Sequence, residues 1–388
     1  MYNKTAVFWA ACFGMLLFGI GLITPGSIAS DLKEKFELND KMIGGVFSIL
    51  PAGILLGSLL FGPICDRSGY KTILILACLG MTIGFEGIAL VSSLNALKLS
   101  VLIFGLSAGI INGATNALVS DISDKSKGAN LSLLGVFFGI GALGMPFLLA
   151  LLMEIFTDFQ IVMAMGGLTL ATAVFYSRIK FPPSKKELGF PLKKAKTLFK
   201  ESYLYLIAFY LFFQGGLESI LNNWTTIYLT SYHFSLEKNA LFALTLYVAG
   251  MIAMRLLIGS VFRRMGFFKL MIVSFLLILS GVLLVHLGSS FNFSVAGLIF
   301  LGIGLAAGFP IMLGLAGEKY SAQSGTAFSI IFTIALFGNI FINKLMGFVA
   351  KNYGIQHYTS LLFVELACML FLFFFIFREK NKLDTQPS

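Results

Sequence analysis

Charged residues are scarce in this chain of 388 residues: Asp, Glu, Lys and Arg make up 12% of it, whereas soluble domains have about 25%. The dipeptide Gly-Lys does not occur, which excludes a Walker A phosphate loop and argues against ATP-driven pumping by this chain. The four cysteines show no paired spacing typical of disulfides or zinc sites. No nucleophile–base or metal-ligand cluster is visible. We therefore expect no cofactor, no metal ion and no enzymatic activity.

Long apolar segments dominate instead, and 57% of the residues are hydrophobic. A helix that spans a bilayer needs about 20 mostly apolar residues, and alternating ten-residue strands of the β-barrel type are absent. The sequence predicts an all-α, multi-pass membrane protein, which we expect to be monomeric. Its twelve predicted spans are residues 6–28, 42–62, 72–92, 97–119, 131–152, 159–178, 202–222, 239–260, 268–288, 295–315, 325–349 and 357–377.

The distribution of Lys and Arg predicts the orientation, because cytoplasmic segments are enriched in these residues. With a cytoplasmic N-terminus, the cytoplasmic segments hold 20 of them and the outer loops 6. We therefore expect both termini in the cytoplasm, in an inner or plasma membrane. The basic segment 179–201 separates two groups of six spans, 1–178 and 202–388. It is predicted to be a linker that lies on anionic lipid rather than binding nucleic acid.

The two predicted halves contain related loops. The stretch GPICDRSGYK begins at Gly62, and GSVFRRMGFFK begins at Gly259. Their alignment places Asp66 on Arg263, so the second copy lacks the acid. Parallel six-helix repeats are typical of one transporter architecture.

The loop at Gly62 resembles the signature G-x-x-x-D-R-x-G-R-K of the major facilitator superfamily, and the twelve spans with a central linker agree with it. The resemblance implies two six-helix halves that rock about a central site. It also implies a latch that closes the cytoplasmic side, with Asp121 as the partner of Arg67. The predicted latch residues are Gly62, Asp66, Arg67, Gly69 and Asp121.

Three further stretches are similar to the fucose-permease-like branch, whose members take up monosaccharides with protons. They are LSLLGVFFGIGALGMP from Leu131, GGLESILNNWTTIYL from Gly215 and GMIAMRLLIG from Gly250. The seventh helix of that branch carries a Glu and then a Trp, which Glu218 and Trp224 match. Met254 departs from the pattern, because a Gly precedes the corresponding Arg in the branch.

Glu218 is the strongest intramembrane candidate, because polar groups inside a membrane are costly and usually functional. Burial among Phe and Leu favours the protonated form of a carboxylate, so Glu218 could carry the coupling proton. The alternative is a structural Glu that bonds a neighbouring helix. Gln214 lies one turn earlier and would share its face.

Asn222 and Asn223 carry amides that suit sugar hydroxyls, and Trp224 could stack on a sugar ring. Adjacent Asn residues weaken a helix, so we expect a break in the seventh span where it lines a cavity. The alternative is that the span simply ends there, with Trp224 in the interfacial aromatic belt.

Other polar residues in the spans have two readings each. Glu86 is a second proton site or a partner for another helix. Arg255 is expected to form a structural ion pair rather than to bind a ligand, and Lys344 binds an anion or reaches toward the interface. The remaining predicted ligands are amides that could instead bond between helices: Asn112, Asn116 and Asn339.

The function we expect from the sequence is proton-coupled uptake of a monosaccharide or a similar small polar solute. Drug or organic-anion efflux is the alternative within transport, with Arg255 or Lys344 as the charge partner. Met145–Pro146 and the residues after it depart from the antiporter motif, which disfavours efflux. A non-transporting nutrient sensor is the alternative from another class, and the short C-terminal tail argues against it.

Overall fold

The structure of the chain is a computed structural model that describes residues 2–38, 40–124, 126–152, 154–187, 195–232, 236–288 and 290–385. Residues 188–194 of the predicted linker lie outside the described residues, as does Lys125, which contributes to the charge asymmetry. The described residues form helices joined by short turns, with no strand among them. The predicted all-α fold is confirmed.

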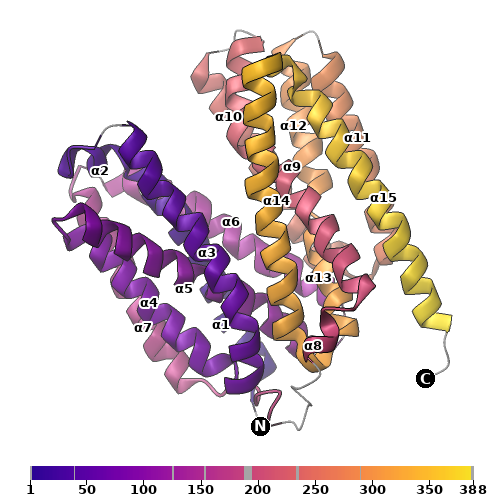
Figure 1. Cartoon of the computed structure of the whole chain (residues 1–388), viewed down its shortest axis with the longest axis horizontal. Coiled ribbons are helices and arrows are strands. Elements are labelled where there is room, and N and C mark those ends of the chain that lie inside the picture. Colours follow the sequence, from indigo (N-terminus) through magenta and orange to yellow (C-terminus); the bar gives the residue numbers. More distant parts are fainter. Residues whose placement is uncertain are drawn as a thin grey trace. The chain divides into compact units, whose positions relative to one another are not determined.

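Helices α1 to α7 run through the first part of the chain, drawn from indigo to magenta in Figure 1. Most are about as long as a bilayer requires, and α2 is a short helix after α1. Their bounds are α1 Lys4–Ser27, α2 Ala29–Lys35, α3 Asp40–Ser68, α4 Tyr70–Leu90, α5 Leu94–Ile122, α6 Lys127–Leu152 and α7 Asp158–Arg178.

Helices α8 to α15 form the second part, drawn from red to yellow in Figure 1. Short 3-10 turns precede three of them. The bounds are α8 Ala195–Leu198, α9 Ser202–Tyr232, α10 Glu237–Gly259, η2 Val261–Arg264, α11 Phe267–Leu287, α12 Phe291–Leu305, α13 Gly308–Lys319, η3 Ser321–Gln323, α14 Ser324–Tyr353, η4 Ile355–His357 and α15 Tyr358–Thr385.

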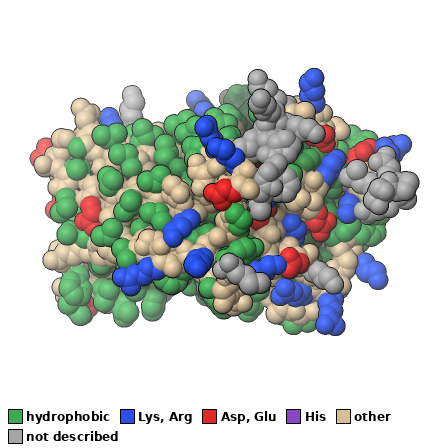
Figure 2. All heavy atoms as spheres, turned by 90° about the horizontal axis from the view of Figure 1, so that it is seen from below, with side chains coloured by type: hydrophobic (Ala, Val, Ile, Leu, Met, Phe, Trp, Pro, Cys, Tyr) green, Lys and Arg blue, Asp and Glu red, His purple; other side chains and the backbone are tan. Residues whose placement is uncertain are grey.

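Within the described part of the chain, twelve helical segments are long and apolar enough to cross a membrane. Each overlaps one of the twelve predicted spans, with the seventh extending nine residues beyond its predicted end, and α12 and α13 together make the tenth. Broad areas of hydrophobic side chains cover the face in Figure 2, with Lys and Arg between them. Large side chains such as Leu76 and Phe371 are more than half exposed, which suits a surface that contacts lipid.

The chain forms two compact units. Unit 1 comprises Met1–Asp124, Leu134–Lys196 and Tyr320–Ser329, and unit 2 comprises Lys125–Leu133, Thr197–Lys319 and Ile330–Ser388. The start of α6 thus belongs to unit 2 and the start of α14 to unit 1. The boundaries predicted from the linker, at 178 and 202, do not include these two short exchanged segments.

Helix α5 is central in unit 1, where it packs against α1, α3 and α4, while α4 also packs against α7. The α3–α5 contact is close because glycines line it. A Cβ added at Gly53 or Gly57 would overlap the backbone of α5 at Leu102–Leu106. Small residues allow such close approach of helices in lipid. In unit 2, α12 packs against α10 and α11, and α15 packs against α9.

Candidate functional site

Glu218 lies midway along α9, with its side chain partly exposed. Gln214, one turn earlier on the same face, is completely buried and donates from Nε2 to Glu218 Oε1 at 2.9 Å. The spacing of four residues brings these two side chains together, as the sequence predicts. The carboxylate is therefore accessible on one side and held by a buried amide on the other.

The same Gln214 amide reaches a break in the tenth span. Helix α12 ends at Leu305 and α13 begins at Gly308, because Pro310 has no N–H for the carbonyl of Ala306 and crowds it. The carbonyl oxygen of Leu305, the last residue of α12, accepts from Gln214 Nε2 at 3.1 Å. A Cβ at Gly308 would overlap Gln214 Oε1, so the glycine makes room for the amide. One side chain thus joins Glu218 to a discontinuous helix.

Several buried polar atoms of unit 2 have no hydrogen-bond partner among the described residues. Among them are Gln214 Oε1, Tyr247 OH, Arg255 Nε and Asn339 Oδ1. Asn339 packs against α9, where a Cβ on Gly215 would overlap its Oδ1. Leaving a buried donor or acceptor unpaired costs about 1–3 kcal/mol, so such groups call for an explanation. A polar ligand or water would satisfy them.

Arg255 lies on α10 and interacts with Glu218 and with Tyr247 through its charge. No salt bridge of Arg255 occurs in the described part of the chain, so the expected structural ion pair is not found there. The backbone of Arg255 accepts a hydrogen bond from Ser132 Oγ at 2.9 Å. Its guanidinium contributes a positive charge to the surroundings of Glu218 without neutralising it by direct contact.

The predicted break in the seventh span is wrong. Helix α9 continues without interruption to Tyr232, and the Asn222 side chain donates from Nδ2 to the carbonyl of Glu218 at 2.8 Å within the helix. This bond runs along the helix rather than replacing it. The break that lines the site is instead the one between α12 and α13.

Trp224 and Asn223 both contact Asn343 of α14. The indole Nε1 donates to Asn343 Oδ1 at 2.8 Å, and Asn223 Nδ2 lies 3.3 Å from the same oxygen. Asn223 also donates to Ser219 Oγ at 3.2 Å. Six of the residues predicted to bind the solute lie in unit 2, on α9 and α14: Gln214, Glu218, Asn222, Asn223, Trp224 and Asn339.

The predicted ligands Asn112 and Asn116 lie on α5 in unit 1. Asn116 is buried, and its Nδ2 donates to the carbonyl of Asn112 at 2.8 Å and to Asn112 Oδ1 at 3.2 Å. Both bonds stay within one helix. The two amides therefore form a local polar pair and do not bridge helices.

Glu86 lies on α4, against α7. A Cβ on Gly166 of α7 would overlap Glu86 Oε1, and Thr82 and Thr169 share a hydrogen bond of 2.8 Å across the same pair of helices. Of the two readings from sequence, this placement favours a role in helix packing.

The Asp66 carboxylate binds the first turn of α14, within unit 1. It accepts from the backbone N–H of Gly325 at 3.2 Å and of Thr326 at 2.9 Å, and from Thr326 Oγ1 at 2.7 Å. A carboxylate at a helix N-terminus satisfies unpaired N–H groups and complements the helix dipole. Gly62 allows this approach, because its Cα lies directly against the Gly325 carbonyl.

Asp121 pairs with Lys185 rather than with Arg67. Its Oδ2 lies 2.7 Å from Lys185 Nζ and accepts from the hydroxyl of Tyr70 at 2.6 Å, whereas the Arg67 side chain is exposed. Gly69 supplies the turn between α3 and α4, with φ of 81°, a conformation that favours glycine. Lys185 of the linker is thus the cationic partner of Asp121, a role that the sequence analysis predicted for Arg67.

Sequence reasoning passed over several side chains that the structure makes prominent. Glu365 of α15 is 1% exposed with an unpaired Oε2 among the described residues, and its isolation in the predicted twelfth span was a usable signal. Tyr247 gave no such signal, because tyrosine is common in spans. Pro310 in the tenth span could have indicated the helix break.

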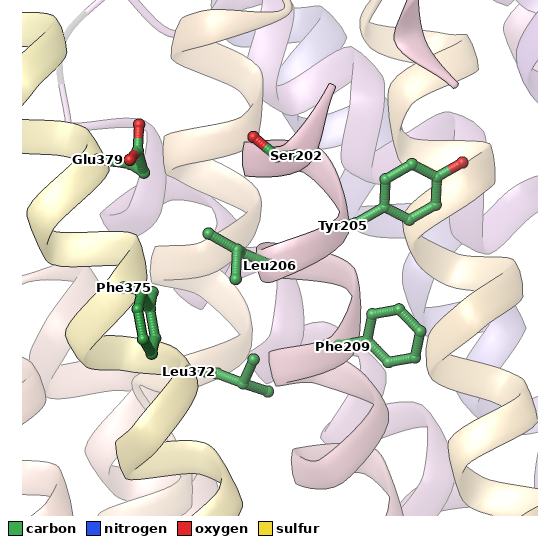
Figure 3. Close-up of a pocket in the computed structure, with 7 residues that line it drawn as sticks. All are labelled: Ser202, Tyr205, Leu206, Phe209, Leu372, Phe375 and Glu379. Atoms are coloured by element: carbon green, nitrogen blue, oxygen red, sulfur yellow. The ribbon is translucent and has the colours of Figure 1, made fainter. Parts of the chain in front are cut away.

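A groove of about 330 Å³ separates the ends of α9 and α15. Figure 3 shows Leu206, Leu372 and Phe375 between these helices, with Glu379 and Ser202 at one end. The lining is mostly apolar, and Glu379 pairs with Lys382 at 2.6 Å. These features suit contact with lipid and distinguish the groove from the polar cluster around Glu218.

Twelve helices long and apolar enough to cross a membrane, found among the described residues together with buried polar groups, indicate an integral, multi-pass membrane protein. The model of the Major Facilitator Superfamily matches residues 11–283 and 239–388. The chain belongs to this superfamily.

Three curated relatives illustrate the range of similar proteins. The chain is 23% identical to a TsgA homolog of Buchnera aphidicola in an alignment 390 positions long, gaps included, that covers 98% of each protein. It is 25% identical to the glucose/mannose transporter GlcP of Bacillus subtilis over 355 residues, 86% of each. It is 27% identical to the multi-drug resistance efflux pump PmrA of Streptococcus pneumoniae over 208 residues, 51% of this chain and 52% of PmrA.

Two solved structures share the fold. FucP, a fucose:proton symporter of E. coli, superposes with a TM-score of 0.80 at 16% identity, over 95% of this chain and 98% of FucP. The proton:xylose symporter XylE superposes with a TM-score of 0.79 at 14% identity, over 96% of each chain. At these identities the likeness establishes the fold alone.

Proposed function

We propose that the protein takes up a monosaccharide or a similar small polar solute together with protons, in an inner or plasma membrane with both termini in the cytoplasm. The observation that carries the proposal is the partly exposed Glu218 carboxylate, bonded to the buried Gln214, which in turn bonds the broken tenth span. A proton on Glu218 changes both its charge and its hydrogen bond to Gln214. Solute binding, proton binding and the shape of the tenth span are thereby coupled.

The unpaired buried atoms support a polyhydroxylated ligand. Gln214 Oε1 and Asn339 Oδ1 are acceptors and Tyr247 OH can donate or accept, so hydroxyl groups can satisfy all three. Asn222 and Asn223 are exposed, and Trp224 offers an aromatic surface beside them. In unit 1, Asn112 and Asn116 remain proposed ligands. GlcP, FucP and XylE, which are described as sugar carriers, are consistent with this class of solute.

The test is thermal stabilisation of the purified protein by a panel of hexoses, pentoses, sugar acids and cationic drugs, since a ligand of the native state raises its melting temperature. We expect stabilisation by at least one neutral sugar. That sugar should accumulate in proteoliposomes when an imposed pH gradient brings protons in with it. Stabilisation by sugar acids or cationic drugs alone would refute the proposal.

Efflux is the second candidate, favoured by the similarity to PmrA and by the positive charge of Arg255 near Glu218. An efflux carrier of organic anions would need the positive charge of Arg255 to bind its substrate. An Arg255→Gln variant would therefore lose organic-anion transport. The two functions differ in the sign of coupling in the same proteoliposomes: a proton symporter accumulates solute on the side toward which protons flow, whereas a proton-driven efflux antiporter accumulates it on the opposite side.

A further inference from the structure

Asn343 of α14 lies between two side chains of the candidate solute site on α9. Its single Oδ1 accepts from Trp224 Nε1 at 2.8 Å and lies 3.3 Å from Asn223 Nδ2. One carbonyl oxygen has two lone pairs and can serve both donors. Asn343 therefore fixes both side chains relative to α14, and all three residues belong to unit 2.

Gly347, one turn beyond Asn343, supports the indole along the same edge. A Cβ added there would lie 3.4 Å from Trp224 Cζ2 and 3.6 Å from Cη2. These carbons and Nε1 lie on one edge of the indole, so this edge rests on α14. Residues 343 and 347 are four apart and share one face of the helix. The ring is thus held at two points along one edge and cannot rotate about its χ angles without losing the hydrogen bond.

This arrangement decides what Trp224 can offer a solute. The only polar group of the indole is its N–H, and Asn343 already accepts it. Trp224 then contributes its aromatic surface and no hydrogen bond. Asn223 is exposed, and its amide oxygen remains available for a hydroxyl group after Nδ2 has bonded Asn343 and Ser219.

We propose that Asn343 is a positioning residue for solute binding: it holds the Trp224 ring and the Asn223 amide in the orientation that a neutral monosaccharide requires. The inference rests on the proposed function, because it assigns a role within the same site. Preorganisation of this kind raises affinity, because the ordering of the two side chains is completed before the solute arrives.

Trp224 itself reports on the test, since the chain contains only two tryptophans. In a Trp9→Phe background, its fluorescence emission and its quenching by acrylamide measure the state of the indole. Three variants are compared in that background: Asn343→Asp, which keeps an acceptor oxygen, and Asn343→Leu and Asn343→Ala, which remove it. Asn352→Leu is the matched control, because Asn352 lies on the same helix and, among the described residues, its side chain bonds only the carbonyl of Phe348.

D-glucose is the solute probe, and its binding and its uptake are measured on the same proteins. Asn343→Leu and Asn343→Ala should shift the Trp224 emission and increase acrylamide quenching at least twofold. They should raise the half-saturating concentration of D-glucose about tenfold, the equivalent of one lost hydrogen bond, and leave the maximal rate within about twofold. Asn343→Asp should have the Trp224 fluorescence and the D-glucose affinity of the Trp9→Phe protein. Asn352→Leu should change neither the fluorescence nor the affinity.

Unchanged emission and quenching in both oxygen-removing variants would overturn the proposal, and so would altered fluorescence with unaltered D-glucose affinity. Loss of maximal rate and of melting temperature without a change in affinity would assign Asn343 to folding alone and would also overturn it. If the Trp9→Phe protein binds no D-glucose, the sugar part of the proposed function fails for this hexose. The fluorescence comparison then still decides whether Asn343 holds Trp224.

Discussion

Replacement of Glu218 by Gln is the perturbation that tests proton coupling most directly. Gln keeps the shape of the side chain and an oxygen that accepts from Gln214, but it cannot release a proton. The hydrogen bond at Glu218 changes from one with a charged acceptor to a neutral one. Such bonds contribute about 1.5–3 and about 0.5–1.5 kcal/mol respectively, so the variant should lose about 1 kcal/mol and remain folded.

The effect on transport should be far larger than the effect on stability. A gradient of one pH unit supplies about 1.4 kcal/mol per proton, which supports about tenfold accumulation of solute if one proton accompanies each molecule. In the Glu218→Gln variant the accumulation ratio should fall to about one. Solute binding and exchange between the two sides of the membrane should continue, because Gln resembles the protonated carboxyl.

The assay is uptake of the stabilising sugar into proteoliposomes at several imposed pH gradients, beside exchange at equal pH. Glu86→Gln is the control: Glu86 packs against Gly166, so its replacement should lower stability more than coupling. Uphill accumulation by Glu218→Gln with normal pH dependence would refute the reasoning. Glu218 would then be structural, and Glu86 would become the first candidate for proton coupling.

Three further outcomes are expected. Asp66→Asn removes an acceptor charge from the first turn of α14 and should lower turnover and shift the protein toward the inward-open state, as measured by distances between labels on the two halves. Lys185→Ala leaves the partly buried Asp121 without its cation, which should cost about 1–3 kcal/mol and lower the melting temperature. In a cysteine-free background, a Cys near Lys238 should react with an impermeant thiol reagent on intact cells, and one near Lys193 should not.

Each outcome has its own control. Thr326→Val removes only the hydroxyl donor to Asp66 and should have a smaller effect than Asp66→Asn; an unchanged distribution of states in Asp66→Asn would show that the loop is only a turn. Lys185→Arg keeps the charge and should preserve the melting temperature. Equal melting temperatures for Lys185→Ala and the wild type would show that the ion pair contributes nothing. Labelling in the opposite pattern would invert the orientation.

The features that depend on local composition could be predicted from the sequence. A bilayer of fixed thickness requires helices of about 20 apolar residues, so the twelve spans follow from hydrophobicity and length alone. The approach of Gln214 to Glu218 follows from the helical repeat, since residues four apart share a face. The duplicated loops at Gly62 and Gly259 sufficed for the resemblance to the superfamily.

The features that depend on distant partners required the tertiary structure. Asn222 and Asn223 predict a weakened helix by propensity, yet α9 continues, because bonds within α9 and to Asn343 of α14 satisfy these amides. Lys185 rather than Arg67 reaches Asp121 because the linker folds back onto unit 1. A single sequence gives the type of a polar residue and its place along a helix, but the acceptor it meets lies on another helix. For this reason the spans were determined by sequence alone, whereas the partners inside the polar clusters were decided by packing.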